Sequence, residues 1–363
     1  MERVLMYKAN YLADVLGYKV GFVTTEQKGR ASFFTFSSKI DFFDLGINYD
    51  EDKDKNLVLR FFLKLLKKRK HQRYLHELLV REQPDICVSM FDRDMDFLYK
   101  IEDGSKKILE YHFSKNFKLI EATNPIIYFF QKIRIWNWGK IIQKYACFVV
   151  LTEEDKKAWG DFHNICVIPN FLTALPKDLA ALVSKRVISV GRLENQKGFD
   201  YLIKTWSIVC EIYPDWSLCI FGDGDKRKEL EHLVSQFGLE NSVFLKEPTS
   251  DIKNEYLQSS VYAMCSRYEG LPMVLLEAMS YGLPIVSFTC PCGPRDVVKE
   301  SFGSLVPVGD IDSFAGELMA WMASYEKRCM AGKNARHAAE HYLESEVMMR
   351  WERLFRLLAF GES

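Results

Sequence analysis

Short runs of β-branched and aromatic residues alternate with longer helical segments along nearly the whole 363-residue chain. The apolar runs have the length of buried strands, and the segments between them are long enough for crossover helices. The pattern therefore predicts parallel sheets built from β-α-β units, which is an α/β fold. The expected strands are 20–24, 85–89, 107–110, 148–152, 166–168, 187–190, 218–221, 243–245, 262–265 and 285–288.

The strands form two sets, and a chain of this length has room for two domains of about 100 to 200 residues each. Residues 169–185 contain two prolines and show no strong periodicity, so they are the predicted linker. We expect the boundary near Leu172. This gives an N-terminal domain of residues 1–172, a second domain of residues 173–343 and a C-terminal helix within 344–363.

Composition excludes several classes of protein. Lys plus Arg and Asp plus Glu each total 49, so there is no net charge to attract nucleic acid and we expect no nucleic-acid partner. The nine cysteines are an odd number, and five of them lie inside apolar runs, which favours a reducing, cytoplasmic location. No apolar run approaches the roughly 18 residues of a membrane span. A signal peptide and a cysteine-histidine cluster with zinc spacing are also absent from the sequence.

The sequence opens unusually for this class. Residues 2–16 have a helical pattern that ends at Gly17, and the first strand follows. A doubly wound domain normally opens with a strand and a glycine-rich turn before that helix. We therefore expect the N-terminal domain to lack its first strand here, through a misassigned gene start or a truncated clone. If the natural gene begins at this point, we expect activity to suffer.

The strand 187–190 runs into Gly191 and Arg192, and Lys197 follows before the next helix. Glycine permits a tight turn, and both cations fall at the carboxyl edge of the sheet, where open α/β sheets bind ligands. This favours an anionic ligand. The alternative is that both are solvated loop charges.

A second turn, FGDGD at 221–225, places Gly222 and Gly224 where a nucleotide could approach the backbone. Two Asp-x-Asp pairs, one in this turn and one at 92–94, match a metal-binding pattern but lie in ordinary loops. We predict no metal site at either pair.

The segment 265–288 contains the largest number of candidate ligand-binding residues. Glu269, Gly270 and Leu271 precede Pro272, which we expect to be the first helical residue, with Met273 following it. The helix N-terminus would then offer free N–H groups to a phosphate or a sugar hydroxyl. Glu277 lies on an otherwise apolar helix and needs a partner. That partner is either a ligand, or a structural ion pair or solvent.

In order and spacing, these three segments resemble the retaining nucleotide-sugar glycosyltransferases of family 4. The resemblance runs from about residue 187 to 308, where CGPRDVV also matches, and extends thinly into the first half through ERVLMYKANYLADVLGYKV, EYHFS, LTEED and VIPN. It implies a GT-B fold, in which two Rossmann-like domains face a cleft. The acceptor would bind the first domain and the donor the second, and the last helix, 346–358, would cross back.

The resemblance also implies roles. Arg192 and Lys197 would clamp the donor diphosphate in place of a metal ion, so neither a metal nor another cofactor is expected. Glu269 and the backbone at 270–273 would contact the transferred sugar, and Glu277 would hold the ribose. Gly191, Gly222 and Gly224 would line the nucleotide, and His112 would approach the sugar and acceptor, unless it is a strand-end histidine bonded to backbone. Retention is usually drawn as front-face substitution, so no protein nucleophile is expected.

The implied reaction moves a hexose from a nucleoside-diphosphate sugar, by default a UDP-sugar, to a glycan or lipid-linked acceptor of cell-surface polysaccharide. Two alternatives remain open, a GT-B sugar-nucleotide epimerase and a truncated donor-binding protein without turnover. Over residues 57–71, cations recur at helical spacing opposite aromatic and aliphatic residues, which predicts a helix, and residues 126–144 mix the same residue types. They predict a peripheral contact with an anionic membrane surface, or else a solvated face above core aromatics.

Overall fold

The computed structural model describes residues 2–30, 32, 34–52 and 54–361. The first-half strands are β1 (Val20–Thr24), β2 (Ile40–Asp44), β3 (Ile86–Ser89), β4 (Lys106–Tyr111), β5 (Cys147–Val150) and β6 (Ile165–Val167). The second-half strands are β7 (Arg186–Val190), β8 (Ser217–Phe221), β9 (Val243–Lys246), β10 (Val261–Met264), β11 (Ile285–Phe288) and β12 (Gly303–Val306). The longer helices are α1 (Glu2–Asp14), α2 (Leu57–Glu82), α4 (Pro125–Ile142), α6 (Phe199–Ile212), α7 (Arg227–Gln236), α9 (Met273–Ser280), α11 (Ile311–Met322), α12 (Tyr325–Glu340) and α13 (Glu344–Phe360). Shorter helices are α3 (Phe117–Ile120), α5 (Glu153–Trp159), α8 (Ile252–Leu257) and α10 (Pro294–Val297), with 3-10 turns η1 (Tyr49–Asp52), η2 (Leu98–Lys100) and η3 (Asn195–Lys197).

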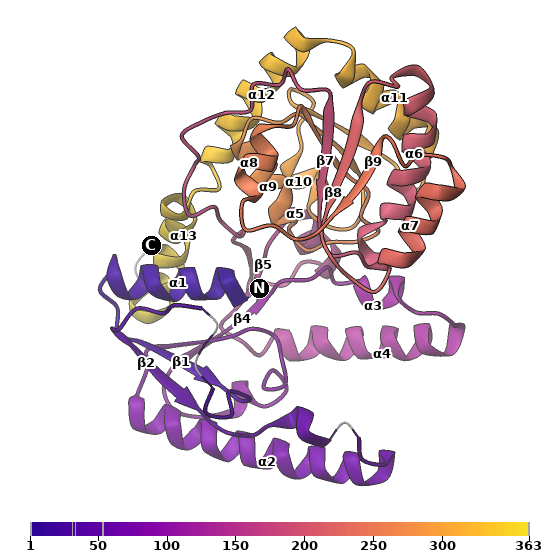
Figure 1. The fold of residues 1–363 in the computed structure, drawn as a ribbon. Coiled ribbons are helices and arrows are strands. Elements are labelled where there is room, and N and C mark those ends of the chain that lie inside the picture. The colour runs from indigo at the N-terminus through magenta and orange to yellow at the C-terminus, as the bar shows by residue number, and fades with distance from the viewer. Residues whose placement is uncertain (1, 31, 33, 53, 362–363) are drawn as a thin grey trace.

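Every paired strand runs parallel to its neighbour, which confirms the predicted α/β class. The second half forms one six-stranded sheet in the order β12-β11-β10-β7-β8-β9. In Figure 1, α6, α7 and α11 lie to one side of strands β7 to β9, and α8 and α9 lie to the other. The chain reverses its direction of progress across the sheet beside β7, so the loops that leave β7 and β10 adjoin one another.

The first half holds two separate sheets, a four-stranded one in the order β3-β4-β5-β6 and a pair, β1-β2. The predicted opening is confirmed, because α1 precedes β1 and ends before Gly17. Residues 169–185 contain no helix and no extended strand, as the linker prediction required.

All ten predicted strands overlap an observed one, but β2 and β12 were not predicted. Strand β2 has the sequence IDFFD, and its two aspartates interrupt the continuous apolar run that marks a buried strand. Strand β12 has only four residues and begins at Gly303, where a Cβ would lie 2.7 Å from the carbonyl oxygen of Ile285. Close approach to β11 therefore favours glycine at a position where propensity disfavours a strand.

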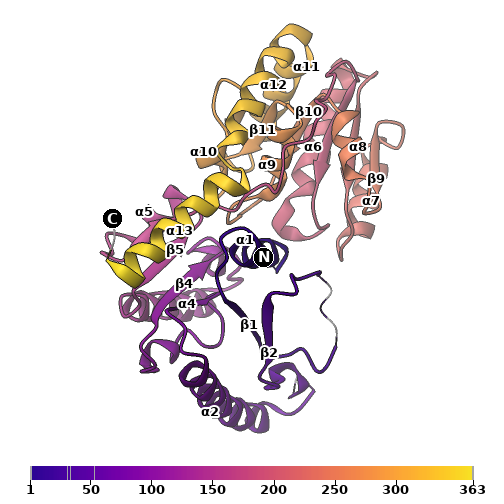
Figure 2. The same cartoon turned by 90° about the vertical axis from the view of Figure 1, so that its left-hand side faces the viewer.

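Helix α13 crosses from the second half to the first, as Figure 2 shows. Its residues Val347, Met348, Trp351 and Phe355 join one buried cluster with Val4 of α1 and with residues of β4 and β5. The junction at Leu172 also forms a parallel bridge with Leu343 just before α13. Division of the chain into domains at residues 172 and 343 stays a prediction, and its end points Met1 and residues 362–363 lie outside the described residues.

Within the described part of the chain, none of the helices combines the length and the apolar content that crossing a membrane would require.

Replacing Trp351 by alanine should test how much α13 contributes to holding the first half. Trp351 is 2% exposed inside the cluster, so its loss should lower the free energy of unfolding by about 3 to 5 kcal/mol. Met349→Ala on the same helix is the control, because Met349 is 54% exposed and should change stability by less than about 0.5 kcal/mol. Urea unfolding measures both variants, and equal effects would contradict this role of α13.

Candidate functional site

The first loop of the site leaves the carboxyl end of β7. Gly191 follows the strand. A Cβ added to Gly191 would lie 3.3 Å from the aliphatic carbons of the Lys197 side chain. Gly198, which caps the start of α6, has a left-handed backbone with φ of 63°. A Cβ there would also lie 2.0 Å from the carbonyl oxygen of Cys265 at the end of β10. Only glycine fits, and it lets the β7 and β10 loops meet.

Lys197 and Glu269 come together where these two loops meet. The Lys197 Nζ lies 2.7 Å from Oε1 of Glu269, and the Ser266 hydroxyl donates to the same oxygen at 2.6 Å. The two charged side chains are only 18% and 7% exposed. A buried carboxylate requires such charge-assisted partners. The structure thus brings two of the predicted site residues into direct contact.

Arg192 does not join this pair. Its Nη1 lies 2.9 Å from Oε1 of Glu194, and its side chain is 67% exposed. The guanidinium therefore points along its own loop toward solvent, which matches the solvated alternative for Arg192 and not for Lys197.

The glycine-rich turn after β8 packs against the β7 loop, backbone against backbone. A Cβ on Gly222 would lie 1.8 Å from the carbonyl oxygen of Gly191, and one on Gly224 would lie 2.5 Å from that of Leu193. Leu193 also donates its N–H to the carbonyl of Asp223 at 2.8 Å. Any side chain at either glycine would separate the two loops. Over the residues that the structure describes, no group of three or more His, Cys, Asp or Glu is placed to hold a metal ion.

The third loop leads into α9 and corrects one prediction. Pro272 precedes the helix as its cap, with ψ of 105°, and Met273 is the first helical residue. The extended ψ removes Pro272 from the helix, although its carbonyl still accepts from Leu275 N–H at 3.0 Å. The loop is fixed from outside as well, because Glu269 N–H donates to Pro291 O at 2.7 Å.

Glu277 lies on α9 and has two partners from other elements. The Tyr256 hydroxyl donates to Oε2 at 3.2 Å, and Arg3 Nη2 lies 3.1 Å from Oε1. The carboxylate side chain remains 25% exposed. Burial and the adjacent Glu277 raise the pKa of Tyr256 well above its usual value, so this tyrosine stays a hydrogen-bond donor. The sequence left open whether Glu277 pairs with a ligand or with a structural partner. The structure shows a structural ion pair with Arg3, and part of the carboxylate remains exposed.

His112 reaches the site through its backbone. A Cβ on Gly270 would lie 2.1 Å from the His112 carbonyl oxygen, so the two halves of the chain touch here. The imidazole is 6% exposed, and its Nε2 lies 3.0 Å from Oε1 of Glu110. The partner is therefore a carboxylate, whereas the alternative in the sequence analysis was a hydrogen bond to the backbone.

Glu110 is itself buried and also pairs with Lys8 of α1. Burial alone would raise the pKa of Glu110, but Lys8 and His112 outweigh it and lower that pKa to about 2. The carboxylate is therefore ionised at neutral pH and orients the His112 ring.

Sequence reasoning missed five residues that support the site, namely Arg3, Lys8, Glu110, Tyr256 and Ser266. One signal was available for two of them. Lys8 interrupts the apolar face of α1, and Glu110 interrupts an apolar strand, and each lone charge in such a place implies a partner. The other three are ordinary polar residues whose positions only the tertiary structure defines.

A second contact between the halves lies beside this site. The Asp296 carboxylate accepts from the backbone N–H of Glu153 at 2.9 Å and of Glu154 at 3.3 Å, at the start of α5. Arg295 Nη1 lies 2.6 Å from the Glu154 carboxylate. An acid at a helix N-terminus is favourable for the free N–H groups and the dipole. These contacts hold α10 of the second half against α5 of the first.

Comparison with known proteins shows the family to which this chain belongs. The family model for glycosyl transferases group 1 matches residues 175–338. An uncharacterized glycosyltransferase of Haemophilus influenzae is 32% identical over 361 residues, covering 97% of this chain and 94% of its own. The chain belongs to the group 1 glycosyltransferases.

Solved structures show the fold of this glycosyltransferase. The apo form of the lipopolysaccharide outer core galactosyltransferase WaaB matches with a TM-score of 0.70 at 20% identity, over 95% of this chain and 99% of WaaB. HepE of Anabaena, solved in complex with UDP, matches with a TM-score of 0.70 at 16% identity, over 97% of this chain and 95% of its own. The predicted GT-B fold is confirmed.

Replacing Gly270 by alanine should separate the two halves at the site. The added Cβ would meet the His112 carbonyl at 2.1 Å, so one backbone must shift, and we expect lower thermal stability and lower transfer activity. Gly316→Ala is the matched control, because an added Cβ there meets nothing within 4 Å and lies in helix α11. It should raise stability by up to about 1 kcal/mol. Thermal unfolding of both variants measures this, and an unchanged G270A would contradict the contact.

Glu110 should make the protein sensitive to acid. Its pKa is about 2 in the fold and about 4.3 in an unfolded chain, so its stabilisation is present above about pH 4.3 and is lost as the pH falls toward 2. Glu110→Gln should lower stability at pH 7, because Lys8 is left buried without its partner, and should show a shallower loss between about pH 5 and 3. Urea unfolding across this range measures it, with the exposed Glu300→Gln as control. The same slope in E110Q and wild type would contradict the argument.

Proposed function

We propose that this glycosyltransferase moves a hexose from a nucleoside-diphosphate sugar, with a UDP-sugar as the default, to a glycan or lipid-linked acceptor in cell-surface polysaccharide biosynthesis. The observation that carries the proposal is the Lys197–Glu269 ion pair, which lies beside Gly270 at the carboxyl edge of the six-stranded sheet. The UDP bound to HepE and the lipopolysaccharide role in the name of WaaB support the donor and the pathway.

Lys197 would move from Glu269 to the donor diphosphate. The ammonium already lies at the loop edge, and neutralising the leaving phosphate lowers the energy of the transition state. Glu269 would then be free to accept hydrogen bonds from hydroxyls of the transferred sugar, while Ser266 keeps one carboxylate oxygen in place. Arg192 would have to leave Glu194 to add a second cation. Two cations in these positions take the place of a metal ion in the proposal.

Glu277 would bind the ribose, since a carboxylate can accept from two neighbouring hydroxyls. Tyr256 holds one of its oxygens, and Arg3 would give way or turn toward the nucleotide phosphates. His112, oriented by Glu110, would face the sugar and acceptor. We propose retention of configuration by front-face substitution, in which the leaving phosphate takes the acceptor proton, so no protein nucleophile is assigned.

Lys197→Ala and Glu277→Ala should each weaken the donor site. A charge-assisted hydrogen bond is worth about 1.5 to 3 kcal/mol, so we expect about a tenfold to hundredfold loss in transfer rate for K197A. The first measurement is thermal stabilisation by a panel of nucleotides and nucleotide sugars. One diphosphate sugar should stabilise the wild type, with and without EDTA, and should stabilise neither variant.

The exposed Lys333→Ala on α12 is the control and should behave as wild type. Stabilisation that persists in both site variants would contradict the assigned site, and stabilisation lost with EDTA would contradict metal independence. Product analysis separates the alternatives. Epimerised nucleotide sugar without acceptor would indicate an epimerase, and binding with neither transfer nor donor hydrolysis would indicate a binding protein.

A further inference from the structure

Helix α4 begins with a segment that is apolar on every side and exposed on nearly every side. Residues 126–130 read IIYFF, and five consecutive residues cover the full circumference of a helix. Ile126, Phe129, Phe130 and Trp136 are 61% to 69% exposed. A helix that is hydrophobic all round is normally buried. This half of α4 therefore presents a surface that water does not favour.

Helix α2 begins in the same way. Val58, Phe61, Phe62 and Leu66 are 58% to 68% exposed. Figure 1 shows the starts of α2 and α4 projecting toward the same side of the molecule, beneath the second half. The core that the sequence alternative placed beneath these segments is absent under Phe61 and Phe62 of α2 and under the start of α4, whereas Trp138 later in α4 does pack against the first-half core. We call the two exposed starts, residues 58–66 of α2 and 126–136 of α4, the apolar tips.

Cations surround the apolar tips. Residues 57–76 and 125–142 contain no Asp or Glu. Lys140 Nζ lies 3.4 Å from the centroid of the Trp136 ring, and Lys132 Nζ lies 4.8 Å from that of Tyr128. These ammonium groups make cation–π contacts with exposed rings, and cations beside Trp and Tyr are typical of residues at a membrane interface.

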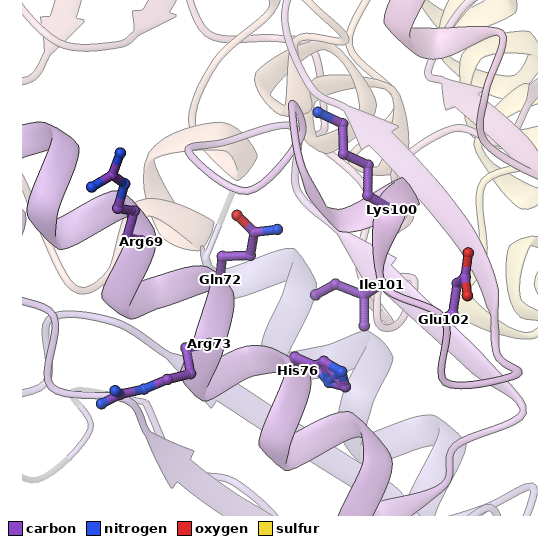
Figure 3. Close-up of a pocket in the computed structure, with 7 residues that line it drawn as sticks. All are labelled: Arg69, Gln72, Arg73, His76, Lys100, Ile101 and Glu102. Atoms are coloured by element: carbon purple, nitrogen blue, oxygen red, sulfur yellow. The ribbon is translucent and has the colours of Figure 1, made fainter.

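A basic hollow continues the same face of α2. Phe62, Leu66, Arg69, Arg73 and His76 follow one another at intervals of three or four residues, so they share one side of the helix. Beyond Leu66 on this side lies a hollow of about 420 Å³, lined by Arg69, Gln72, Arg73 and His76 of α2 and by Lys100, Ile101 and Glu102 (Figure 3). The lining contains three permanent cations and one acid, and Arg73 also lies 3.7 Å from Glu77 on its own helix. This excess of positive charge suits an anionic headgroup.

We propose that the apolar tips and the basic hollow dock this protein onto an anionic lipid bilayer. Phe129, Phe130 and Phe62 would enter the interfacial layer, and the surrounding cations would face the lipid phosphates. A bilayer encloses an inserted segment from all sides, as the start of α4 requires, whereas a protein partner covers one face. A second copy of this chain would bring two basic surfaces together, which like-charge repulsion opposes.

The docked orientation would serve the reaction. Helix α3 joins the tip of α4 to the second half, since Phe117 of α3 lies 6.2 Å from the Tyr268 ring and Glu121 accepts from the Tyr268 hydroxyl at 2.5 Å. Tyr268 is next to Glu269. A lipid-linked acceptor held in the bilayer would thus lie near the transfer site, a step that rests on the proposed function, whereas the docking itself does not.

Vesicle co-sedimentation tests the docking. The full chain should pellet with vesicles that contain about one-third phosphatidylglycerol, and about tenfold less with phosphatidylcholine alone. The double variant Phe129→Ser/Phe130→Ser should bind the anionic vesicles at least about tenfold more weakly, because both side chains lose their place in the interface. Phe360→Ser is the matched control, since Phe360 is 68% exposed on α13, away from the tips, and it should bind as wild type.

The charge is tested separately. Arg60→Glu/Lys64→Glu should abolish the preference for anionic lipid, whereas Lys333→Glu should not. Failure of wild type to pellet, equal binding of both lipid compositions, or an equal loss in F360S would overturn the proposal. So would a dimer in light scattering that disappears in F129S/F130S, which would assign the tips to a second copy. Thermal stabilisation by nucleotide sugar, measured on the same samples, reports the donor site independently and confirms that each variant is folded.

Discussion

The backbone of Gly270 touches the backbone of His112, and no side chain fits between them. This contact brings the loop that carries Glu269 onto the end of β4 in the other half of the chain. Around it lie the Asp296 carboxylate on the start of α5 and the crossing of α13, which buries Trp351 among first-half residues. Because close-packed backbones tolerate little displacement, the absence of a side chain at Gly270 sets the distance between the two halves at this contact.

The charged side chains of the candidate site all form ion pairs with one another or with neighbouring elements. Lys197 pairs with Glu269, Glu277 with Arg3, and Glu110 with both Lys8 and His112. In the proposed function, a diphosphate or a ribose would replace one partner of each of the first two pairs. The third group is buried and orients the His112 imidazole. Partial burial strengthens each interaction relative to water, so we expect each proposed exchange to have a substantial effect on ligand binding.

Strand prediction succeeded wherever a strand is buried on both faces, because a continuous apolar run is then required. It failed at β2, where two aspartates interrupt the apolar run, and at β12, which begins with a glycine held close to β11. Helix α2 was recognised over residues 57–71 and extends to Glu82, and Pro272 proved to be a cap. Boundaries of this kind depend on capping contacts that the local pattern does not contain.

The sequence by itself determined the α/β class, the lack of regular structure in residues 169–185 and the loops proposed to form the site, because periodicity, glycine-rich turns and lone charges in apolar segments are local properties. It also singled out Lys197 and Glu269, whose spacing of 72 residues the fold closes to 2.7 Å. Only the tertiary structure decided that Arg192 turns to Glu194, that Lys8 and Glu110 hold His112, and that the aromatic residues of the apolar tips are exposed. Each of these depends on which elements meet across the chain, and a helical pattern cannot tell a buried apolar face from an exposed one.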